Sequence, residues 1–412
     1  MGARPPLRSF PVLPLFLIPA ACAAPVTIRT DFEGGGLGTV ERLGETVFRC
    51  RVPGQADRDG RNRQVSWYFF RVDGARGREV TITLHDLVGE YNYRPGAVAI
   101  VPETLPFRSD DGESWAPMEG ISYDRQRHEL TMRFVPRGDA IWIAHVEPYP
   151  ASRLLRLVGE LGRRPSVRVE SIGKSVRGRD LHLLTITDPA LPDSSKKVLW
   201  FMFRQHAWES GTSFVAEGLL RFAVSDAPEA RRLRERILLK VFPMLDPDGC
   251  ASGAVRFNAN GFDLNRNWDS CDLSRDEHRL LMPEIWHAKK VLVEWIASGH
   301  PIHFFLALHN EEKGEWIAAP PEFRDLSFRF FERLKRETSF DPSREGPSFR
   351  AAPRPDPGRM TVDDFLGREC RVPAFLMEQR IVPGPRLGRA PLSADRLRFG
   401  RELLLAAAVV LD

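Results

Sequence analysis

Three short segments of the chain carry side chains that together could hold a catalytic metal ion. His206 and Glu209 form a His-x-x-Glu pattern, and His309 follows much later in the chain. Two imidazoles and one carboxylate leave the fourth position of a zinc ion open, which is typical of a catalytic rather than a structural site. Between them, Asn265 and Arg266 offer an amide and a planar guanidinium that pair well with a carboxylate. These residue types predict a zinc hydrolase that recognises a carboxylate.

Two apolar runs would position the metal ligands. Residues 197–203 and 303–308 are apolar enough to form strands buried on both faces, and a ligand segment follows each run. Open α/β sheets usually place their chemistry at the carboxyl ends of such strands. The hydroxyl-rich residues 210–213 could then cap a helix over 214–224. The His-x-x-Glu pattern alone is weak, because a lone histidine at a strand end is more often a hydrogen-bonded core or surface group than a ligand.

Further motifs between the ligand segments give the chain a family resemblance. They are Pro-Met-Leu-Asp-Pro-Asp-Gly at 243–249, Arg256, and Asp-Leu-Asn-Arg-Asn-Trp at 263–268. With a strand-end histidine and a late glutamate after them, this order resembles the M14 zinc carboxypeptidases, most of all the cytosolic carboxypeptidase branch and its bacterial relatives. The resemblance covers residues 30 to 412, with further matching stretches at 67–72, 144–150 and 171–181.

The resemblance implies a role for each group at the metal. Three residues would bind one Zn²⁺ ion: His206, Glu209 and His309. Glu378, on the apolar run 373–380, matches the family's catalytic glutamate. A metal ion and one general base suffice to hydrolyse an amide, and the base should be a carboxylate near the metal but not on it. The alternative for Glu378 is an ion pair with Arg380 or another arginine.

The arginines of this region match groups that bind substrate. Asn265 and Arg266 match the pair that clamps the terminal carboxylate, which makes an enzyme act at a chain end. Arg256 matches the arginine that stabilises the oxyanion of the tetrahedral intermediate. Taken alone, either arginine would more often be a solvated surface charge, because most of the 59 Lys and Arg residues are Arg. The surrounding Asp-Leu-Asn-Arg-Asn-Trp sequence favours the binding role for Arg266.

Three features depart from the family pattern. Residues 310–312, Asn-Glu-Glu, replace a glycine- or serine-containing sequence after the second metal histidine, and Ala207 and Trp208 replace a proline-glycine pair. A bulky indole and additional acids beside the metal could narrow the pocket or change its charge. Many relatives place a tyrosine shortly before the catalytic glutamate, but all five tyrosines here precede residue 150. Either that role is absent, another residue takes it, or the substrate differs.

The preferred side chain of the substrate stays open. Asp363 and Asp364 occupy the stretch before the catalytic glutamate that forms the floor of the specificity pocket in related digestive enzymes. An acid there would favour a C-terminal Lys or Arg through charge pairing. Alternatively, one of these aspartates is a helix N-cap or a partner for Arg359 or Arg368. The eukaryotic members of the branch trim glutamates, which would need a basic pocket instead.

Length and composition fit two domains. With 412 residues and 42% hydrophobic content, the chain can bury a large core. Short alternating runs such as 79–84 and 129–134, separated by Gly, Pro and Asp clusters, predict an antiparallel β-sandwich over 24–150. A linker with a short helix is expected at 151–164. From there, alternating strands and helices over 165–412 predict an α/β catalytic domain with a mostly parallel mixed sheet flanked by helices.

The amino terminus predicts a separate processing event. Arg4 and Arg8 precede an apolar run, and small residues at 21–23 offer a cleavage site, as in a secretory signal peptide over 1–23. Prolines within the apolar run fit a signal peptide poorly, and a disordered leader is the alternative. We therefore expect a periplasmic or secreted protein, with the cytoplasm as the alternative location.

Charge, hydrophobicity and cysteine content limit the binding partners, membrane segments and disulfides that we expect. A net charge of +4 and a pI near 8.9 indicate a mildly basic surface, and no concentrated Lys/Arg run indicates nucleic-acid binding. No stretch after the leader is long and apolar enough to cross a membrane. Cys250 and Cys271 could be joined in an oxidising compartment, or all four cysteines after the leader could be reduced thiols.

Together these features predict a zinc-dependent metallocarboxypeptidase that acts on the free C-termini of peptides or proteins. The alternatives are a zinc amidase on N-acyl amino acids or murein-derived peptides, and a carboxylate-binding protein that has lost catalysis.

Overall fold

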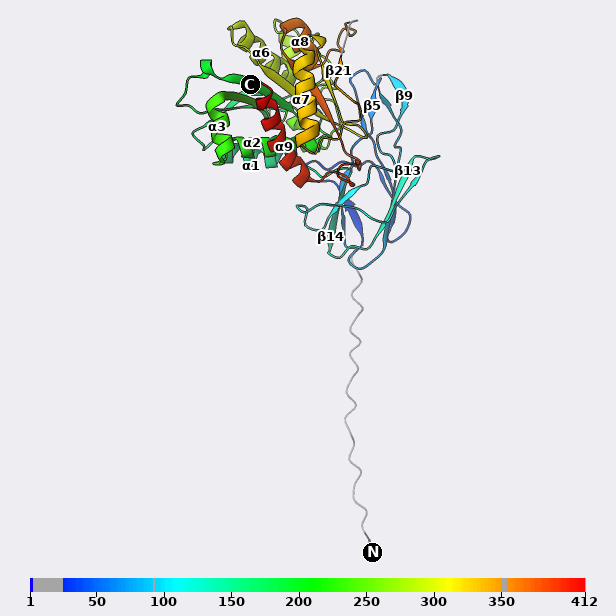
Figure 1. Ribbon diagram of the computed structural model, residues 1–412. Helices are drawn as coiled ribbons and strands as arrows, with labels where there is room; N and C mark the ends of the chain where they lie inside the picture. Colours follow the sequence, from blue (N-terminus) through cyan, green and yellow to red (C-terminus); the bar gives the residue numbers. More distant parts are fainter. Residues whose placement is uncertain (3–24, 92, 350–353, 412) are drawn as a thin grey trace.

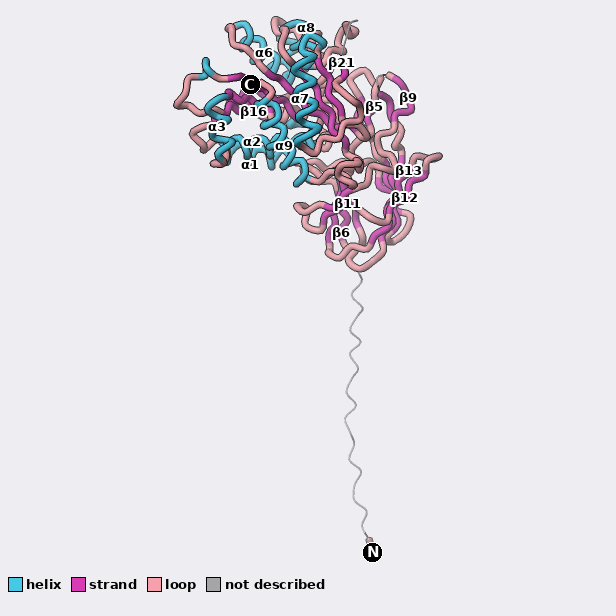
Figure 2. Tube along the Cα trace, viewed as in Figure 1, coloured by secondary structure: helices cyan, strands magenta, loops and turns pink. Residues whose placement is uncertain are grey.

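The computed structural model describes residues 1–2, 25–91, 93–349 and 354–411. A β-rich region built from the first part of the chain stands beside an α/β region built from the rest (Figure 1). The helices gather in the α/β region (Figure 2). Residues 3–23 of the predicted signal peptide lie outside the described residues. None of the described helices combines the length and apolar character that crossing a bilayer requires.

Three sheets build the β-rich region. Their strand orders are β1-β6-β14-β10-β11, β12-β13-β7-β3-β2 and β4-β5-β8-β9. The strands are β1 Thr27–Arg29, β2 Val40–Arg42, β3 Val47–Arg51, β4 Gln55–Ala56, β5 Arg63–Gln64, β6 Phe69–Asp73, β7 Val80–His85, β8 Gly89–Tyr91, β9 Arg94–Ala97, β10 Phe107–Ser109, β11 Ala116–Pro117, β12 Ile121–Asp124, β13 Glu129–Phe134 and β14 Ala140–Ala144.

The two five-stranded sheets form the predicted sandwich. Val80, Ile82 and Leu84 of β7 are buried at alternate positions and share one core with Phe70 of β6 and Ile143 of β14 from the facing sheet. The sequence predicted an antiparallel sandwich. This was wrong for one strand pair, because β3 and β7 pair in parallel. The strands β4 to β6 lie between them in the chain and belong to other sheets, so they provide the crossover that a parallel pair requires.

An eight-stranded mixed sheet forms the centre of the α/β region. Its order is β15-β16-β18-β17-β19-β22-β20-β21, and the pairs β17/β18, β17/β19, β19/β22 and β20/β21 are parallel. The strands are β15 Val167–Lys174, β16 Asp180–Ile186, β17 Lys197–Phe203, β18 Ile237–Phe242, β19 Phe304–Glu311, β20 Trp316–Ala319, β21 Ser348–Phe349 and β22 Ala374–Arg380.

Helices cover both faces of this sheet. The described helices are α1 Ala151–Leu161, α2 Ser210–Ala223, α3 Pro228–Arg236, α4 Pro247–Ser252, α5 Asp276–Leu281, α6 Pro283–Ala297, α7 Arg324–Glu337, α8 Val362–Cys370 and α9 Ser393–Val409, with 3₁₀ turns at Asp193–Ser195 and Pro321–Phe323. Alternate residues of β17 enter different cores. Phe201 packs with α1, α2, α7 and α9, whereas Trp200 packs with α6 and α8. The unbroken apolar run at 197–203 therefore encodes a strand buried on both faces.

A fourth apolar cluster joins the two regions. Trp67 and Val146 from the β-rich region pack with Trp208, Val255 and Ile381 from the α/β region. Trp208 lies between His206 and Glu209 in the sequence. This indole, which departs from the family pattern, therefore packs in the junction between the two domains. The described parts of the chain thus have the predicted fold class, a β-rich domain followed by an α/β domain.

Candidate metal centre

A tight turn after β17 positions His206 and Glu209. Arg204 has a φ of +54°, in the left-handed region that non-glycine residues seldom adopt. Its buried guanidinium donates through Nε to the carbonyl oxygen of Ala207 at 2.8 Å and through Nη1 to the hydroxyl of Ser213 at 3.0 Å. The buried Arg204 side chain therefore stabilises this turn through hydrogen bonds. Glu209 is the N-cap of α2, so the helix begins directly after this residue.

The second histidine comes from the neighbouring strand. His309 lies near the end of β19, which pairs in parallel with β17. The carboxyl ends of the two strands meet at the same edge of the sheet, as the sequence predicted. His206, Glu209 and His309 are each 2% exposed, and one ligand atom from each lies within 4.8 Å of the others.

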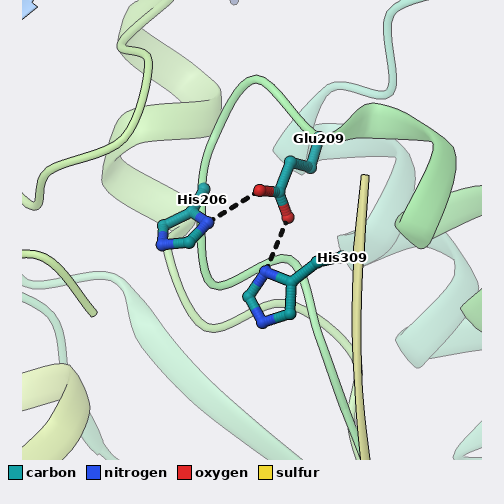
Figure 3. Close-up of side chains that lie close together, drawn as sticks. All are labelled: His206, Glu209 and His309. Atoms are coloured by element: carbon teal, nitrogen blue, oxygen red, sulfur yellow. Dashed lines mark hydrogen bonds and ion pairs between the residues drawn. The ribbon is translucent and has the colours of Figure 1, made fainter. Parts of the chain in front are cut away.

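The Glu209 carboxylate lies between the two imidazoles (Figure 3). One oxygen is 2.7 Å from Nδ1 of His206 and the other is 3.0 Å from Nδ1 of His309. Both Nδ1 atoms therefore face the same point, and a metal ion there would leave both Nε2 atoms protonated. Two imidazole nitrogens and a carboxylate oxygen are donors that zinc prefers, so this donor set fits a zinc ion with an open position.

Two further residues hold the imidazoles from behind. Nε2 of His206 is 3.0 Å from Oδ1 of Asp263, and Nε2 of His309 is 3.0 Å from Oε1 of Gln205. Oxygen acceptors at Nε2 fix the tautomer in which Nδ1 binds a metal. Neither role was predicted from the sequence. Asp263 begins the Asp-Leu-Asn-Arg-Asn-Trp motif and Gln205 directly precedes the His-x-x-Glu pattern, but sequence alone did not show which nitrogen of each ring faces the metal.

Asp263 also orients the predicted oxyanion-binding arginine. Its second oxygen, Oδ2, accepts from Nε of Arg256 at 2.7 Å. Burial by itself would raise the pKa of Asp263, but the charges of Arg256 and His206 outweigh burial and hold this pKa well below its usual range. Asp263 therefore stays ionised and links the metal-ligand side of the cavity to the arginine side.

The predicted carboxylate clamp borders the same cavity. Arg266 donates through Nη1 to the backbone oxygen of Asn265 at 2.8 Å and through Nη2 to the hydroxyl of Tyr91 at 3.1 Å. The amide oxygen of Asn265 accepts from the backbone of Val362 at 3.0 Å. Tyr91 comes from β8 of the β-rich domain, so a tyrosine does reach this site from far upstream in the chain.

Glu378 lies beside the metal ligands. It is directly opposite His309 in the parallel pairing of β19 with β22, and its Oε2 is buried without a hydrogen-bond partner among the described residues. Burial, with the nearby charges of Glu209 and Glu311, raises the pKa of Glu378. The alternative partner, Arg380, donates instead to the backbone oxygen of Asp341 at 2.7 Å.

A cavity of about 340 Å³ brings these groups together. Its lining includes the metal-ligand candidates, the proposed base and the substrate-binding candidates: His206, Glu209, Arg256, Asn265, Arg266, His309 and Glu378. The departures from the family pattern also border it: Trp208, Asn310, Glu311 and Glu312. Additional carboxylates and an indole therefore face the space where a substrate would lie.

The two specificity candidates do not line this cavity. Asp363 and Asp364 are buried in the first turn of α8, where Thr361 is the N-cap. Asp364 lies 3.7 Å from Arg368. A contact with Arg368 is one of the alternative roles predicted for these aspartates. Their part in the side-chain preference of the enzyme stays a prediction.

The fold and the His–Glu–His donor set fit the class of zinc hydrolases. Residues 157–320 match the zinc carboxypeptidase family M14, and residues 28–146 match the cytosolic carboxypeptidase N-terminal domain. The chain belongs to the M14 family of zinc carboxypeptidases. Cytosolic carboxypeptidase 6 of Mus musculus is 32% identical over 260 residues, which cover 59% of this chain and 46% of that relative. The chain thus spans about half the length of this relative.

Solved structures share the whole architecture. A metallo-carboxypeptidase from Burkholderia cenocepacia matches with a TM-score of 0.79 and 22% identity, over 94% of this chain and 99% of that chain. A metallo-carboxypeptidase from Pseudomonas aeruginosa, solved in complex with (2-guanidinoethylmercapto)succinic acid, matches with a TM-score of 0.74 and 26% identity, over 94% and 99% of the two chains. The predicted family and enzyme class are confirmed.

Replacing Asp263 by asparagine is expected to weaken zinc binding. The Asp263→Asn variant removes the charged acceptor behind His206, and loss of such a partner typically lowers metal affinity about 10- to 100-fold. Competition with a chromophoric chelator measures the zinc affinity. Asp272→Asn is the matched control, because Asp272 is an exposed residue that lies outside the cavity. An affinity equal in both variants would mean that Asp263 does not support the metal ligand.

Proposed function

We propose that the chain is a zinc-dependent carboxypeptidase that hydrolyses the C-terminal peptide bond of peptides or proteins. The main support is a single cavity that is lined by the His206, Glu209 and His309 cluster, by Glu378 and by Arg266. A metal site, a base and a carboxylate-binding arginine are the parts that cleavage of a terminal residue requires.

The proposed carboxypeptidase uses one zinc ion as its cofactor. When bound, zinc polarises the scissile carbonyl and lowers the pKa of a water molecule toward 7. The residues of the chain supply the remaining functions. Glu378 accepts the proton of the attacking water through Oε2, which has no hydrogen-bond partner among the described residues, and passes the proton to the leaving amine. Arg256, held at Nε by Asp263, stabilises the negative oxygen of the tetrahedral intermediate with its other N–H donors.

The choice of a chain end is assigned to Arg266 and Asn265. A guanidinium binds both oxygens of a carboxylate, and a peptide carries a carboxylate only at its C-terminus or on acidic side chains. Of the five N–H donors of Arg266, one on Nη1 and one on Nη2 make protein contacts, and the guanidinium lies half-buried on the cavity wall. A substrate whose terminal carboxylate pairs with Arg266 would have its last peptide bond near the metal.

Cleavage should depend on a free C-terminal carboxylate. We expect stepwise shortening of free-acid peptides by the zinc-loaded protein and no shortening of the same peptides with C-terminal amides, as measured by mass spectrometry. A mixture with varied last residues reveals the side-chain preference. Turnover of small N-acyl amino acids without peptide shortening would instead support an amidase. Tight binding of free-acid peptides without any turnover would support a carboxylate-binding protein.

Export through a cleaved leader is also part of the proposal. The support is the sequence of residues 1–23, with arginines before an apolar run and small residues at its end. Cys50, Cys250, Cys271 and Cys370 are free thiols in the structure. N-terminal sequencing of the protein from cell fractions tests this proposal. A periplasmic or secreted form that starts after the leader would support it, and an uncleaved cytoplasmic form would contradict it.

A further inference from the structure

The four-stranded sheet β4-β5-β8-β9 of the N-terminal domain borders the metal cavity. Gln64 of β5, Tyr91 of β8 and Ala97 of β9 are among the residues that line it. The same sheet also lines a neighbouring cavity of about 370 Å³, with Tyr91, Arg256 and Arg266 on the shared wall. An active site that borders another domain in this way draws part of its surface from that domain.

The first residue of this sheet, Gln55, holds the backbone around Arg256. Its Oε1 accepts from the backbone N–H groups of Val255, Arg256 and Phe257 at 3.0, 2.7 and 2.8 Å. Its Nε2 donates to the carbonyl oxygen of Phe257 at 2.7 Å. One side chain therefore makes four hydrogen bonds to three consecutive residues. Such a clamp fixes the direction in which the Arg256 side chain leaves the backbone.

The Gln55 side chain binds a segment that has little regular structure of its own. Arg256 lies after α4, in a stretch whose one described β-bridge joins Phe257 to Asp263. A further bond links the domains nearby, from the Arg58 backbone N–H to the carbonyl oxygen of Gly261 at 3.0 Å. The position of Arg256 is therefore set by the N-terminal domain at its backbone and by Asp263 at its guanidinium.

The second residue, Tyr91, contacts both arginines of the site. Its hydroxyl accepts from Nη2 of Arg266 at 3.1 Å, and its ring centroid lies 5.5 Å from Cζ of Arg256. A phenol that accepts from an arginine still has its own O–H to donate. No described residue takes that proton, so it can be donated to a carboxylate oxygen that Arg266 binds. Tyr91 is 39% exposed and lines the cavity, so a substrate can reach it.

We propose that the sheet β4-β5-β8-β9 is part of the active site, with Gln55 as the positioning residue for Arg256 and Tyr91 as a substrate-binding residue beside Arg266. This proposal rests on the carboxypeptidase function for its kinetic effects. Its structural effects, backbone protection at 255–257 and affinity for a terminal carboxylate, can be measured whether or not the protein turns over peptides.

Gln55 is tested by hydrogen–deuterium exchange and kinetics together. In Gln55→Ala the amides of 255–257 lose their acceptor, and we expect them to exchange about tenfold faster. Misplacement of a catalytic donor by about 1 Å can cost up to ~10²-fold, so we expect kcat to fall about 10- to 100-fold with little change in KM. Gln55→Glu keeps the acceptor oxygen for the three amides but places a second acceptor against the Phe257 carbonyl oxygen, so it should restore protection and kcat only in part.

The matched control for this test is Gln126→Ala, an exposed glutamine in a turn of the same domain. Equal exchange of 255–257 in wild type and Gln55→Ala would overturn the positioning role, even for an inactive protein. Faster exchange without a fall in kcat would also overturn it, because Arg256 would then not depend on the clamp. Failure of the wild type to shorten peptides would count against the carboxypeptidase function alone.

Tyr91 is tested by removing only its hydroxyl. Tyr91→Phe should raise KM for free-acid peptides about tenfold while kcat changes little, as expected for one lost hydrogen bond to a charged group. Tyr123→Phe is the control, because Tyr123 bonds to His128 at 3.3 Å in the same domain. Calorimetry with uncleaved peptides on the Glu378→Gln background should show the same loss for the free acid and none for the C-terminal amide. Equal affinities with and without the hydroxyl would overturn the substrate-binding role.

Discussion

The Glu378→Gln variant should bind zinc normally and lose hydrolysis, with kcat lower by about 10²- to 10⁴-fold. Glutamine keeps the shape of the side chain but has no carboxylate to accept a proton. Because Glu378 lies opposite His309 on the next strand, and is not part of the His–Glu–His cluster, its loss should spare the metal ligands. The rate of peptide shortening and the zinc content are measured on the same sample.

The matched control is Glu315→Gln. Glu315 is also a buried glutamate, burial raises its pKa to about 7, and its Oε2 accepts from the Asp341 backbone N–H at 2.7 Å. It does not line the metal cavity. This variant should therefore keep the wild-type kcat. Hydrolysis by Glu378→Gln at a rate close to that of Glu315→Gln would mean that another group acts as the base.

The positions of the metal ligands could be predicted because local sequence encodes them. Residues 198–203 alternate between two cores, which makes β17 a strand buried on both faces and places its carboxyl end at a defined edge. Parallel pairing with β19 brings His309 to the same edge. Both facts follow from hydrophobic pattern and the right-handed connection rules of α/β sheets.

Other parts of the site depend on packing that the local sequence does not encode. Gln55 and Tyr91 lie in short strands of a separate domain, and nothing near them in the chain indicates that they face Arg256 and Arg266. Asp363 precedes Glu378 at a spacing that fits a pocket floor, yet α8 turns it into the protein interior, away from the cavity lining. Distance along the chain cannot say which face of a helix borders a cavity.

The boundaries and pairing of the elements likewise depend partly on local sequence and partly on the whole domain. The stretch 275–297 looks like one helix by composition, but it is divided at Met282, where α5 ends and Pro283 begins α6. Proline favours the first turn of a helix and removes a backbone donor from a helix interior. The signal for the break was therefore present in the sequence. By contrast, the parallel pairing of β3 with β7 depends on where the intervening strands go, and that is a property of the whole domain.

Removing the metal is expected to abolish hydrolysis reversibly. A strong chelator should stop peptide shortening by the wild type, and added zinc should restore it. Zinc should also raise the Tm of the chelated wild type, because a ligand at 100 times its Kd stabilises the native state by about 2.7 kcal/mol. The apolar cores on both faces of the sheet do not depend on the metal, so the chelated protein should remain folded and recover.

The His309→Ala variant should lose both responses to zinc. The cluster would keep His206 and Glu209 but lack the third ligand, and two ligands do not make the site that a catalytic zinc ion requires. His300→Ala is the control, because His300 is exposed and lies against Trp295 outside the cavity. A zinc-dependent rise in Tm or a recovery of hydrolysis in His309→Ala would place the metal elsewhere. Because Glu209 lies between the two imidazoles, loss of either histidine removes one side of the metal site, and the remaining Glu209 carboxylate cannot replace it.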